Sequence, residues 1–157
     1  VPVRYGGDAG PDMAAVMARC GLESEEAVVR CHAEGRYRVY FLGFLAGFPY
    51  LGGLQPPLAS VPRLETPRQQ LQPGAVGIAG GQTGVYTVAS PGGWHLLGRT
   101  ALPLFDSARD PPALLRPGDR VEFVPVTGEE EEEELLRAAA AVGDRPCGPG
   151  PEAEAAA

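Results

Sequence analysis

The chain has 157 residues and a formal net charge of −7, with no lysine and no asparagine. This length suits one domain that buries its own core. The charge is uneven, because residues 129–157 hold nine acids and two arginines whereas residues 1–128 hold eleven of each. The balanced part offers no basic face for nucleic acid. The lack of lysine excludes a Walker-type phosphate loop and Schiff-base chemistry.

Neither a metal site nor a membrane span is expected. The three cysteines, Cys20, Cys31 and Cys147, show no CxxC spacing, and with His32 and His95 they make no zinc pattern. No apolar run approaches the length of about 18 residues that a membrane span needs, and no signal peptide is recognisable. The sequence therefore predicts a cytoplasmic protein.

The first elements in chain order are a short strand and two helices. Residues 1–5 read as the strand. Apolar residues recur at helical spacing over residues 11–20, which predicts a helix that Gly21 ends. Ser24 is the expected N-cap of a second helix, which stops at Gly35.

Short strands dominate the chain from there to residue 126. Residues 36–43 alternate in polarity and predict a strand whose apolar side includes Phe41. Residues 44–73 contain six prolines and predict a long ordered excursion rather than a regular element. Many short strands with two short helices indicate a mainly β fold, a closed barrel or a sandwich with helical caps. Further strands are expected near residues 75–79, 84–89, 94–99 and 121–126.

The composition changes after residue 127, so we expect a β domain over residues 1–127 and an acidic Glu/Ala/Pro/Gly tail over 128–157. Residues 129–142 can form a helix, because Glu, Leu and Ala are good helix formers. Six adjacent glutamates repel one another, however, and residues 143–157 have a composition typical of disorder. A solvated tail is the preferred interpretation.

Three blocks rich in glycine and aromatic residues are the most informative feature. They read FLGFLAGFPYLGG (41–53), GIAGGQTGVY (77–86) and SPGGWHLLGRT (90–100). Flexible linkers lack large apolar groups, whereas each aromatic side chain can bury about 150–250 Å². The glycines permit positive φ and close backbone approach. Together the blocks predict a packed β-structure whose turns line a cleft.

Eight residues are candidates for contact with a substrate or nucleotide. The arginines suit bidentate recognition of carboxylate or phosphate, and two of them follow prolines on stiff backbone. The GIAGGQTG turn forms either an anion-binding nest or a tight β-turn. For His95, an exposed polar position beside a core of Trp94 and Leu96 is favoured over ligand contact. No nucleophile–base pattern is found, so the catalytic residues stay unknown. The candidates are Arg4, Tyr50, Arg63, Arg68, Gln82, Thr83, His95 and Arg99.

The order of these blocks resembles the C-terminal, cyclophilin-like domain of the KipI / allophanate hydrolase subunit 1 family. The resemblance implies a closed β-barrel of the carboxyltransferase C/D type. Family members begin with another domain, so a chain that starts at Val1 is expected to be a fragment. The matching blocks are PVRYGG (2–7), GFPYLGG (47–53), PR (62–63 and 67–68), GIAGGQTG (77–84), SPGGWHLLGRT (90–100), LFD (104–106) and PGDRVEFVPV (117–126).

In function, the resemblance implies one component of ATP-dependent 5-oxoprolinase, which opens 5-oxo-L-proline to L-glutamate. ATP with Mg²⁺ is then expected at an assembled complex with two partners, which are similar to the C and A subunits of that enzyme. A site shared with a partner would explain why this chain has no self-contained catalytic set, and the chain is not expected to be active alone. Peptidyl-prolyl isomerase activity does not follow from the fold.

Two other functions use the same blocks. One is a KipI-type binding module that inhibits a histidine kinase by docking. The other is a component of allophanate hydrolase or of a urea carboxylase system. The sequence does not choose among the three.

Overall fold

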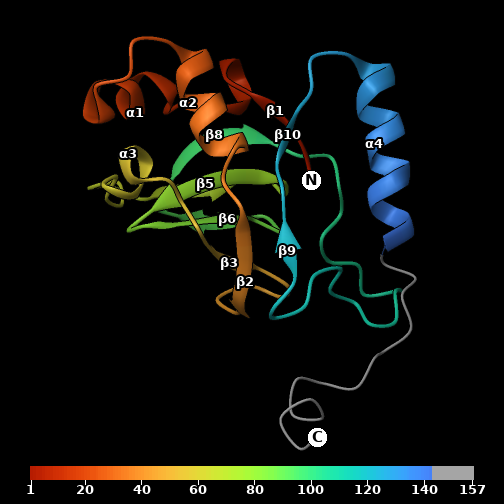
Figure 1. Ribbon diagram of the computed structural model, residues 1–157. Helices are drawn as coiled ribbons and strands as arrows, with labels where there is room; N and C mark the ends of the chain where they lie inside the picture. Colours follow the sequence, from red (N-terminus) through yellow and green to blue (C-terminus); the bar gives the residue numbers. More distant parts are fainter. Residues whose placement is uncertain (143–157) are drawn as a thin grey trace, which may run out of the picture.

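The computed structural model describes residues 1–142, and these form a curled β-sheet with helices at its rim (Figure 1). The strands are β1 (Pro2–Tyr5), β2 (Tyr37–Leu42), β3 (Pro49–Gly52), β4 (Arg68–Leu71), β5 (Ala75–Ala79), β6 (Gln82–Val85), β7 (Ser90–Gly92), β8 (His95–Arg99), β9 (Arg120–Val121) and β10 (Val124–Pro125). The helices are the 3₁₀ turn η1 (Gly7–Ala9), α1 (Met13–Cys20), α2 (Glu25–Ala33), α3 (Pro56–Ala59) and α4 (Glu129–Val142).

Eight strands make one sheet in the order β10-β1-β8-β5-β6-β3-β2-β9. Its two outer strands belong to a single stretch of chain, residues 120–125. In this stretch β9 pairs antiparallel with β2, and β10 pairs parallel with β1. One segment therefore joins both edges, so the sheet wraps around its core (Figure 1). The mainly β class with a barrel-like sheet is confirmed.

The sheet has a buried layer on each face. Because alternate residues of a strand point to opposite faces, Val76 and Ile78 of β5 lie on the inner face, while Ala75 and Ala79 lie on the outer one. Helices α1, α2 and α3 cover one end of the inner face (Figure 1). This double burial explains why every residue of β5 is buried.

His32 of α2 is fully buried at that end, where its ring stacks on Phe123 at 4.5 Å. The Thr83 hydroxyl donates to the Gly77 carbonyl at 2.8 Å, so it accepts from Nε2 of His32 at 2.9 Å. Nδ1 of His32 then accepts from the Tyr5 hydroxyl at 2.6 Å. Burial lowers the pKa of His32 to about 3, so the ring is neutral at physiological pH.

The first two helices follow their sequence signals. Gly21 ends α1 in the left-handed conformation, with φ of 66°. The Ser24 side chain accepts a hydrogen bond from the Ala27 N–H and caps α2 as expected. Helix α1 begins at Met13, two residues later than predicted.

The strand predicted over residues 36–43 forms as β2, but Phe41 does not face the core. A bulge between Val39 and Phe41 shifts the register against β3. A bulge moves the following side chains to the other face, so Phe41 is 50% exposed whereas Tyr37 and Val39 are buried.

The prediction that residues 44–73 form an ordered excursion without a regular element is wrong. This segment contains β3, α3 and β4. Pro56 starts α3 at the first helical position, where its missing N–H costs nothing. Strand β4 pairs with β7 outside the main sheet. The prolines lie at or near the ends of short elements here and do not prevent these elements from forming.

The helix that the sequence allows over residues 129–142 forms as α4. The side of this helix that packs against the core is not exposed to solvent. Leu136 and Ala139 pack against the core, and Glu132 is only 7% exposed. The other five glutamates of the run are exposed, which agrees with the solvated interpretation on that side alone. The disorder expected for residues 143–157 lies outside the described residues, and the domain boundary at residue 127 stays a prediction.

Candidate functional site

The three glycine and aromatic blocks converge on one cleft of about 290 Å³, here called the aromatic cleft. The loop before β4 contributes its remaining wall. The predicted convergence of these turns therefore occurs in the folded chain. The cleft is lined by Phe44, Phe48, Tyr50, Arg63, Leu64, Pro67, Tyr86, Pro91, Gly92, Gly93 and Trp94.

Phe48 is the centre of the aromatic wall. Its buried ring makes edge-on contacts with Tyr50, Tyr86 and Trp94 at centroid distances of 5.0, 5.2 and 5.5 Å. Such contacts favour fixed ring orientations. The cleft is consequently a stiff apolar surface that a flat ring can pack against.

The polar groups of the cleft are phenol hydroxyls and one guanidinium. Burial raises the pKa of Tyr86, while a backbone hydrogen bond at Trp94 and the charges of Arg63 and Arg68 oppose the rise. Tyr86 therefore keeps its proton at neutral pH and can donate a hydrogen bond. Arg63 is exposed at the rim. This arrangement is chemically suited to an anion attached to an apolar ring.

Arg68 lies next to the cleft but is held by Asp12, a residue that the sequence analysis did not single out. The Arg68 guanidinium donates two hydrogen bonds of 2.7 Å to the Asp12 carboxylate, which also accepts from the Leu96 N–H at 2.7 Å. Burial opposes ionisation of Asp12, but these hydrogen bonds and the Arg68 charge outweigh it and lower its pKa. Arg68 thus acts as an ordered neighbour of Tyr86 rather than as a free anion receptor.

His95 lies near Asp12 and contributes to the lowered pKa of that carboxyl. Its Nδ1 is buried and has no hydrogen-bond partner among the described residues. His95 and Arg99 occupy the two ends of β8, and His95 lines neither of the two cavities described here.

Gln82 and Thr83 also lie away from both cavities. Gly80 and Gly81, with φ of 56° and 82°, form a two-residue hairpin turn between Ala79 and Gln82. The tight-turn alternative for this block is therefore the one observed. Thr83 is fully buried in the His32 network.

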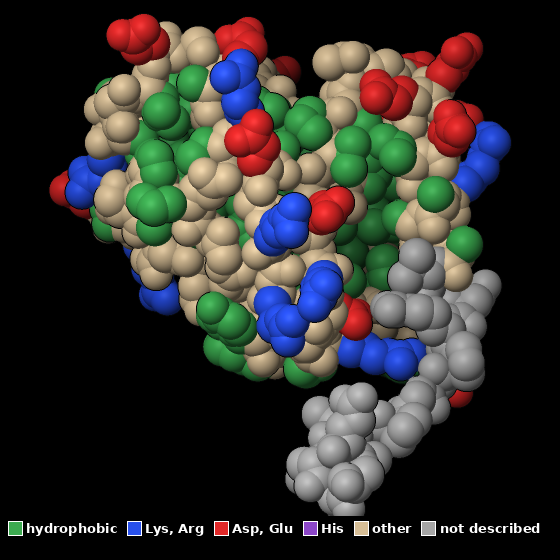
Figure 2. Space-filling view, viewed as in Figure 1, with side chains coloured by type: hydrophobic (Ala, Val, Ile, Leu, Met, Phe, Trp, Pro, Cys, Tyr) green, Lys and Arg blue, Asp and Glu red, His purple; other side chains and the backbone are tan. Residues whose placement is uncertain are grey.

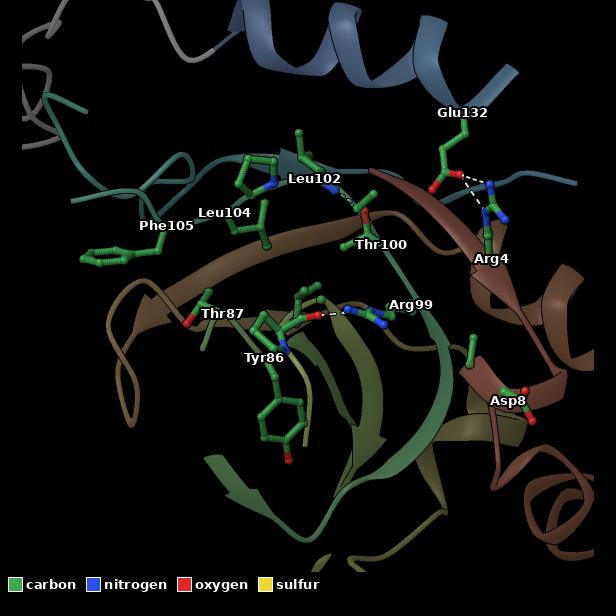
Figure 3. Close-up of a pocket in the computed structure, with 16 residues that line it drawn as sticks. Arg4, Asp8, Tyr86, Thr87, Arg99, Thr100, Leu102, Leu104, Phe105 and Glu132 are labelled. Atoms are coloured by element: carbon green, nitrogen blue, oxygen red, sulfur yellow. Dashed lines mark hydrogen bonds and ion pairs between the residues drawn. The ribbon is translucent and has the colours of Figure 1, made fainter. Parts of the chain in front are cut away.

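A second and larger cavity, of about 870 Å³, holds Arg4 and Arg99. It lies between the sheet and α4, and Figure 2 shows the molecular surface hollowed beside that helix. Figure 3 shows Arg4 meeting Glu132 at one end and the Phe105 ring at the other. Arg99 donates to the Pro73 carbonyl at 3.2 Å.

No group of three or more His, Cys, Asp and Glu side chains is placed to hold a metal ion within residues 1–142. In the same part of the chain, no helix has the length and hydropathy to cross a membrane.

Comparison with known proteins identifies the family. The family model described as carboxyltransferase domain, subdomain C and D, matches residues 1–115. The chain is 58% identical over 125 residues to the B subunit of 5-oxoprolinase from Escherichia coli O157:H7, covering 80% of this chain and 56% of that protein. It is 48% identical over 130 residues to the B subunit of 5-oxoprolinase from Bacillus subtilis (strain 168), covering 83% and 53%.

Among solved structures, a conserved uncharacterized protein from Pyrococcus horikoshii aligns with a TM-score of 0.78 and 50% identity, covering 84% of this chain and 60% of that one. The chain thus spans about half the length of the curated relatives it matches. The match extends through the blocks that line the aromatic cleft, so the resemblance seen in the motifs is confirmed. The chain belongs to the family of carboxyltransferase subdomains C and D.

Proposed function

We propose that this chain is the carboxyltransferase-type part of a 5-oxoprolinase B subunit. The observation that carries the proposal is its 58% identity over 125 residues to the B subunit from Escherichia coli O157:H7. Because the chain spans about half of that protein, the activity belongs to the longer polypeptide in its assembly with partners similar to the C and A subunits. ATP, with Mg²⁺, is the co-substrate of that assembly.

The aromatic cleft fits the carboxylate and ring of 5-oxoproline. The carboxylate pairs with the Arg63 guanidinium and accepts from the Tyr86 hydroxyl, while the lactam ring packs on Trp94. These contacts hold the part of the substrate that does not react and so position the part that does.

The chemistry needs more than this cleft supplies. An unactivated lactam is a poor electrophile, and phosphorylation of its oxygen creates a leaving group that water can displace. The ionisable groups lining the cleft are Tyr50, Arg63 and Tyr86, none of which is an obvious general base at neutral pH. The base and the phosphoryl-transfer groups then come from elsewhere in the assembly, as a shared site requires.

The test is steady-state release of ADP by the full-length gene product assembled with its two partner proteins. Arg63→Gln should raise KM for 5-oxoproline at least about tenfold, because one charge-assisted hydrogen-bonded pair is lost. KM for ATP should stay unchanged. Arg36→Gln is the matched control, since Arg36 is exposed and lines neither cavity.

An assembled complex without 5-oxoproline-dependent turnover would contradict the proposed activity. Equal KM values for Arg63→Gln and Arg36→Gln would instead contradict only the role of the cleft.

A docking module of the KipI type is the second candidate. Three large side chains are unusually exposed, with Tyr40 at 58%, Phe41 at 50% and Phe44 at 66%, and Phe44 borders the cleft. Exposed aromatic groups of this kind are typical of protein interfaces. Direct binding to a histidine-kinase dimerisation domain, without ATP turnover, would favour this function.

A further inference from the structure

The larger cavity contains an arrangement that the aromatic cleft does not explain. Arg4 of β1 and Arg99 of β8 are directly opposed across an antiparallel pair of strands. Opposed residues project to the same face, and like charges in this position destabilise a sheet. Both side chains line the cavity. Two cations held together in a hollow make a site for an anion with more than one negative charge.

Helix α4 already supplies one anion to this site. The Arg4 Nε donates to Glu132 Oε2 at 2.6 Å, and its terminal nitrogen forms an ion pair with the same oxygen (Figure 3). The Glu132 side chain is 10% exposed, so its carboxylate is largely withdrawn from water. The described contacts of Arg99 include only a carbonyl, that of Pro73, and no carboxylate. One of the two cations is therefore neutralised from within the chain.

The rest of the cavity indicates the kind of ligand. Asp8 is its only other acidic lining group in the described part of the chain. Away from the arginines the wall carries the apolar side chains of Leu102, Leu104 and Phe105, together with the hydroxyls of Thr87 and Thr100 (Figure 3). A volume of about 870 Å³ lies in the range of nucleotide and cofactor sites. The end of the cavity that holds the arginines suits a phosphate chain, and the end that holds the aromatic ring suits a flat base attached to that chain.

We propose that the Arg4–Arg99 cavity binds a phosphate-bearing ligand, and that Glu132 of α4 occupies the anion position on Arg4 until the ligand displaces it. The ligand is either a nucleotide or a free phosphate chain. Helix α4 begins at Glu129, beyond the residues 1–115 that the family model matches. The displaceable carboxylate is thus carried by a segment outside the matched family domain. The choice of ATP as a probe rests on the proposed function, but the site itself does not.

The experiment is isothermal titration calorimetry of the full chain at low ionic strength, where charge pairs are least screened, with ATP and with inorganic pyrophosphate as probes. Glu132→Gln should bind about fivefold more tightly than Glu131→Gln, because it removes the internal competitor. Glu131 is an exposed neighbour on the same helix, so this control makes the same change in net charge. Arg99→Gln should bind about tenfold more weakly than the unaltered chain.

A second measurement distinguishes displacement of Glu132 by the ligand from a substitution that simply releases α4 from the sheet. Hydrogen exchange of residues 129–142 in the unaltered chain should speed up at saturating probe, because the ligand releases Glu132 from Arg4. A site for nucleotides binds ATP more tightly than pyrophosphate, whereas a site for the phosphate chain alone binds both equally. Either result supports the proposal.

Equal affinities of Glu132→Gln and Glu131→Gln would overturn it, as would unchanged exchange in α4 or the failure of both probes to bind. Neither 5-oxoproline nor a partner protein is present in these measurements. A complex that fails to turn over 5-oxoproline therefore leaves this result standing, and the two failures are distinguishable.

Discussion

At the scale of single residues, the most constrained side chain is His32. Its two ring nitrogens are both hydrogen-bonded inside the core, to Tyr5 and to Thr83, and its ring stacks on Phe123. Protonation would place a charge in an apolar layer and would remove the acceptor that Tyr5 needs. His32 is therefore a structural residue, and its role is to hold the helical cap on the sheet.

This burial predicts a pH dependence of stability. The pKa of His32 is about 3 in the folded chain and about 6.5 when the chain is unfolded. Between these values the unfolded state binds the proton first, so the free energy of unfolding falls as pH falls, by about 1.4 kcal/mol per pH unit for this group. Above about pH 6.5 it contributes no slope.

Urea unfolding at pH 7, 6, 5 and 4 tests this, with His32→Gln as the comparison. We expect the variant to be less stable than the unaltered chain at pH 7. Below about pH 6.5 its free energy of unfolding should fall less steeply with falling pH than that of the unaltered chain, by about 1.4 kcal/mol per pH unit. Parallel curves for the two proteins would contradict the assignment.

The arginines show how residue type and residue role differ. The four arginines among the predicted site residues were all chosen because a guanidinium can bind an anion. In the structure, however, Arg68 is paired with Asp12 and Arg4 with Glu132. Neither acid is a sequence neighbour of its arginine. The residue type was predictable from sequence, but which guanidinium remains available for a ligand depends on long-range partners.

At the scale of elements, the β5–β6 hairpin shows why the second glycine block has its composition. Gly80 and Gly81 supply the two positive φ values that a two-residue turn of this hand needs. Gly84 is needed for a different reason, because a side chain would not fit there. A Cβ at this position would lie 2.7 Å from Cζ of Phe48 and 2.9 Å from the Pro49 carbonyl oxygen.

Gly84→Ala should therefore push Phe48 out of place and cost about 1–3 kcal/mol. The chain has one tryptophan, Trp94, whose ring contacts Phe48 in the cleft. We expect both a lower urea midpoint and a shift in tryptophan fluorescence. Gly128→Ala is the control, because nothing lies within 4 Å of a Cβ at that position. A variant of Gly84 that matched this control in both measurements would show that the close approach is not rigid.

At the scale of the whole molecule, the segment over residues 120–125 determines how the curled sheet closes. It belongs to both edges of the sheet, and Phe123 lies between its two paired ends. The Phe123 ring contacts His32 of α2 and Tyr37 of β2, at 4.5 and 5.2 Å. One side chain thus connects the closing segment, the helical cap and a strand.

Phe123→Ala should lower the free energy of unfolding by about 3–5 kcal/mol, as expected for a large aromatic deleted from a core. Phe44→Ala, which removes a ring that is 66% exposed, should cost less than about 1 kcal/mol. Chemical unfolding of both variants measures the difference. Similar losses for the two would mean that closure does not depend on the packing of Phe123.

The sequence by itself determined the features that depend on near neighbours. Gly21 and Ser24 marked a helix end and a helix start, and the three glycine and aromatic blocks identified the family and the cleft. These signals are local because φ preference, capping and alternation act over a few residues.

The tertiary structure alone decided the exposure of Phe41, the burial of Glu132 and the pairing of Arg68 with Asp12. It also separated Arg63 from Arg4 and Arg99, in two different cavities. Asp12 and Arg68 are 56 positions apart, and Arg4 and Glu132 are 128 apart. Contacts over such distances form only when the sheet has curled and its edges have joined, and no local pattern encodes them.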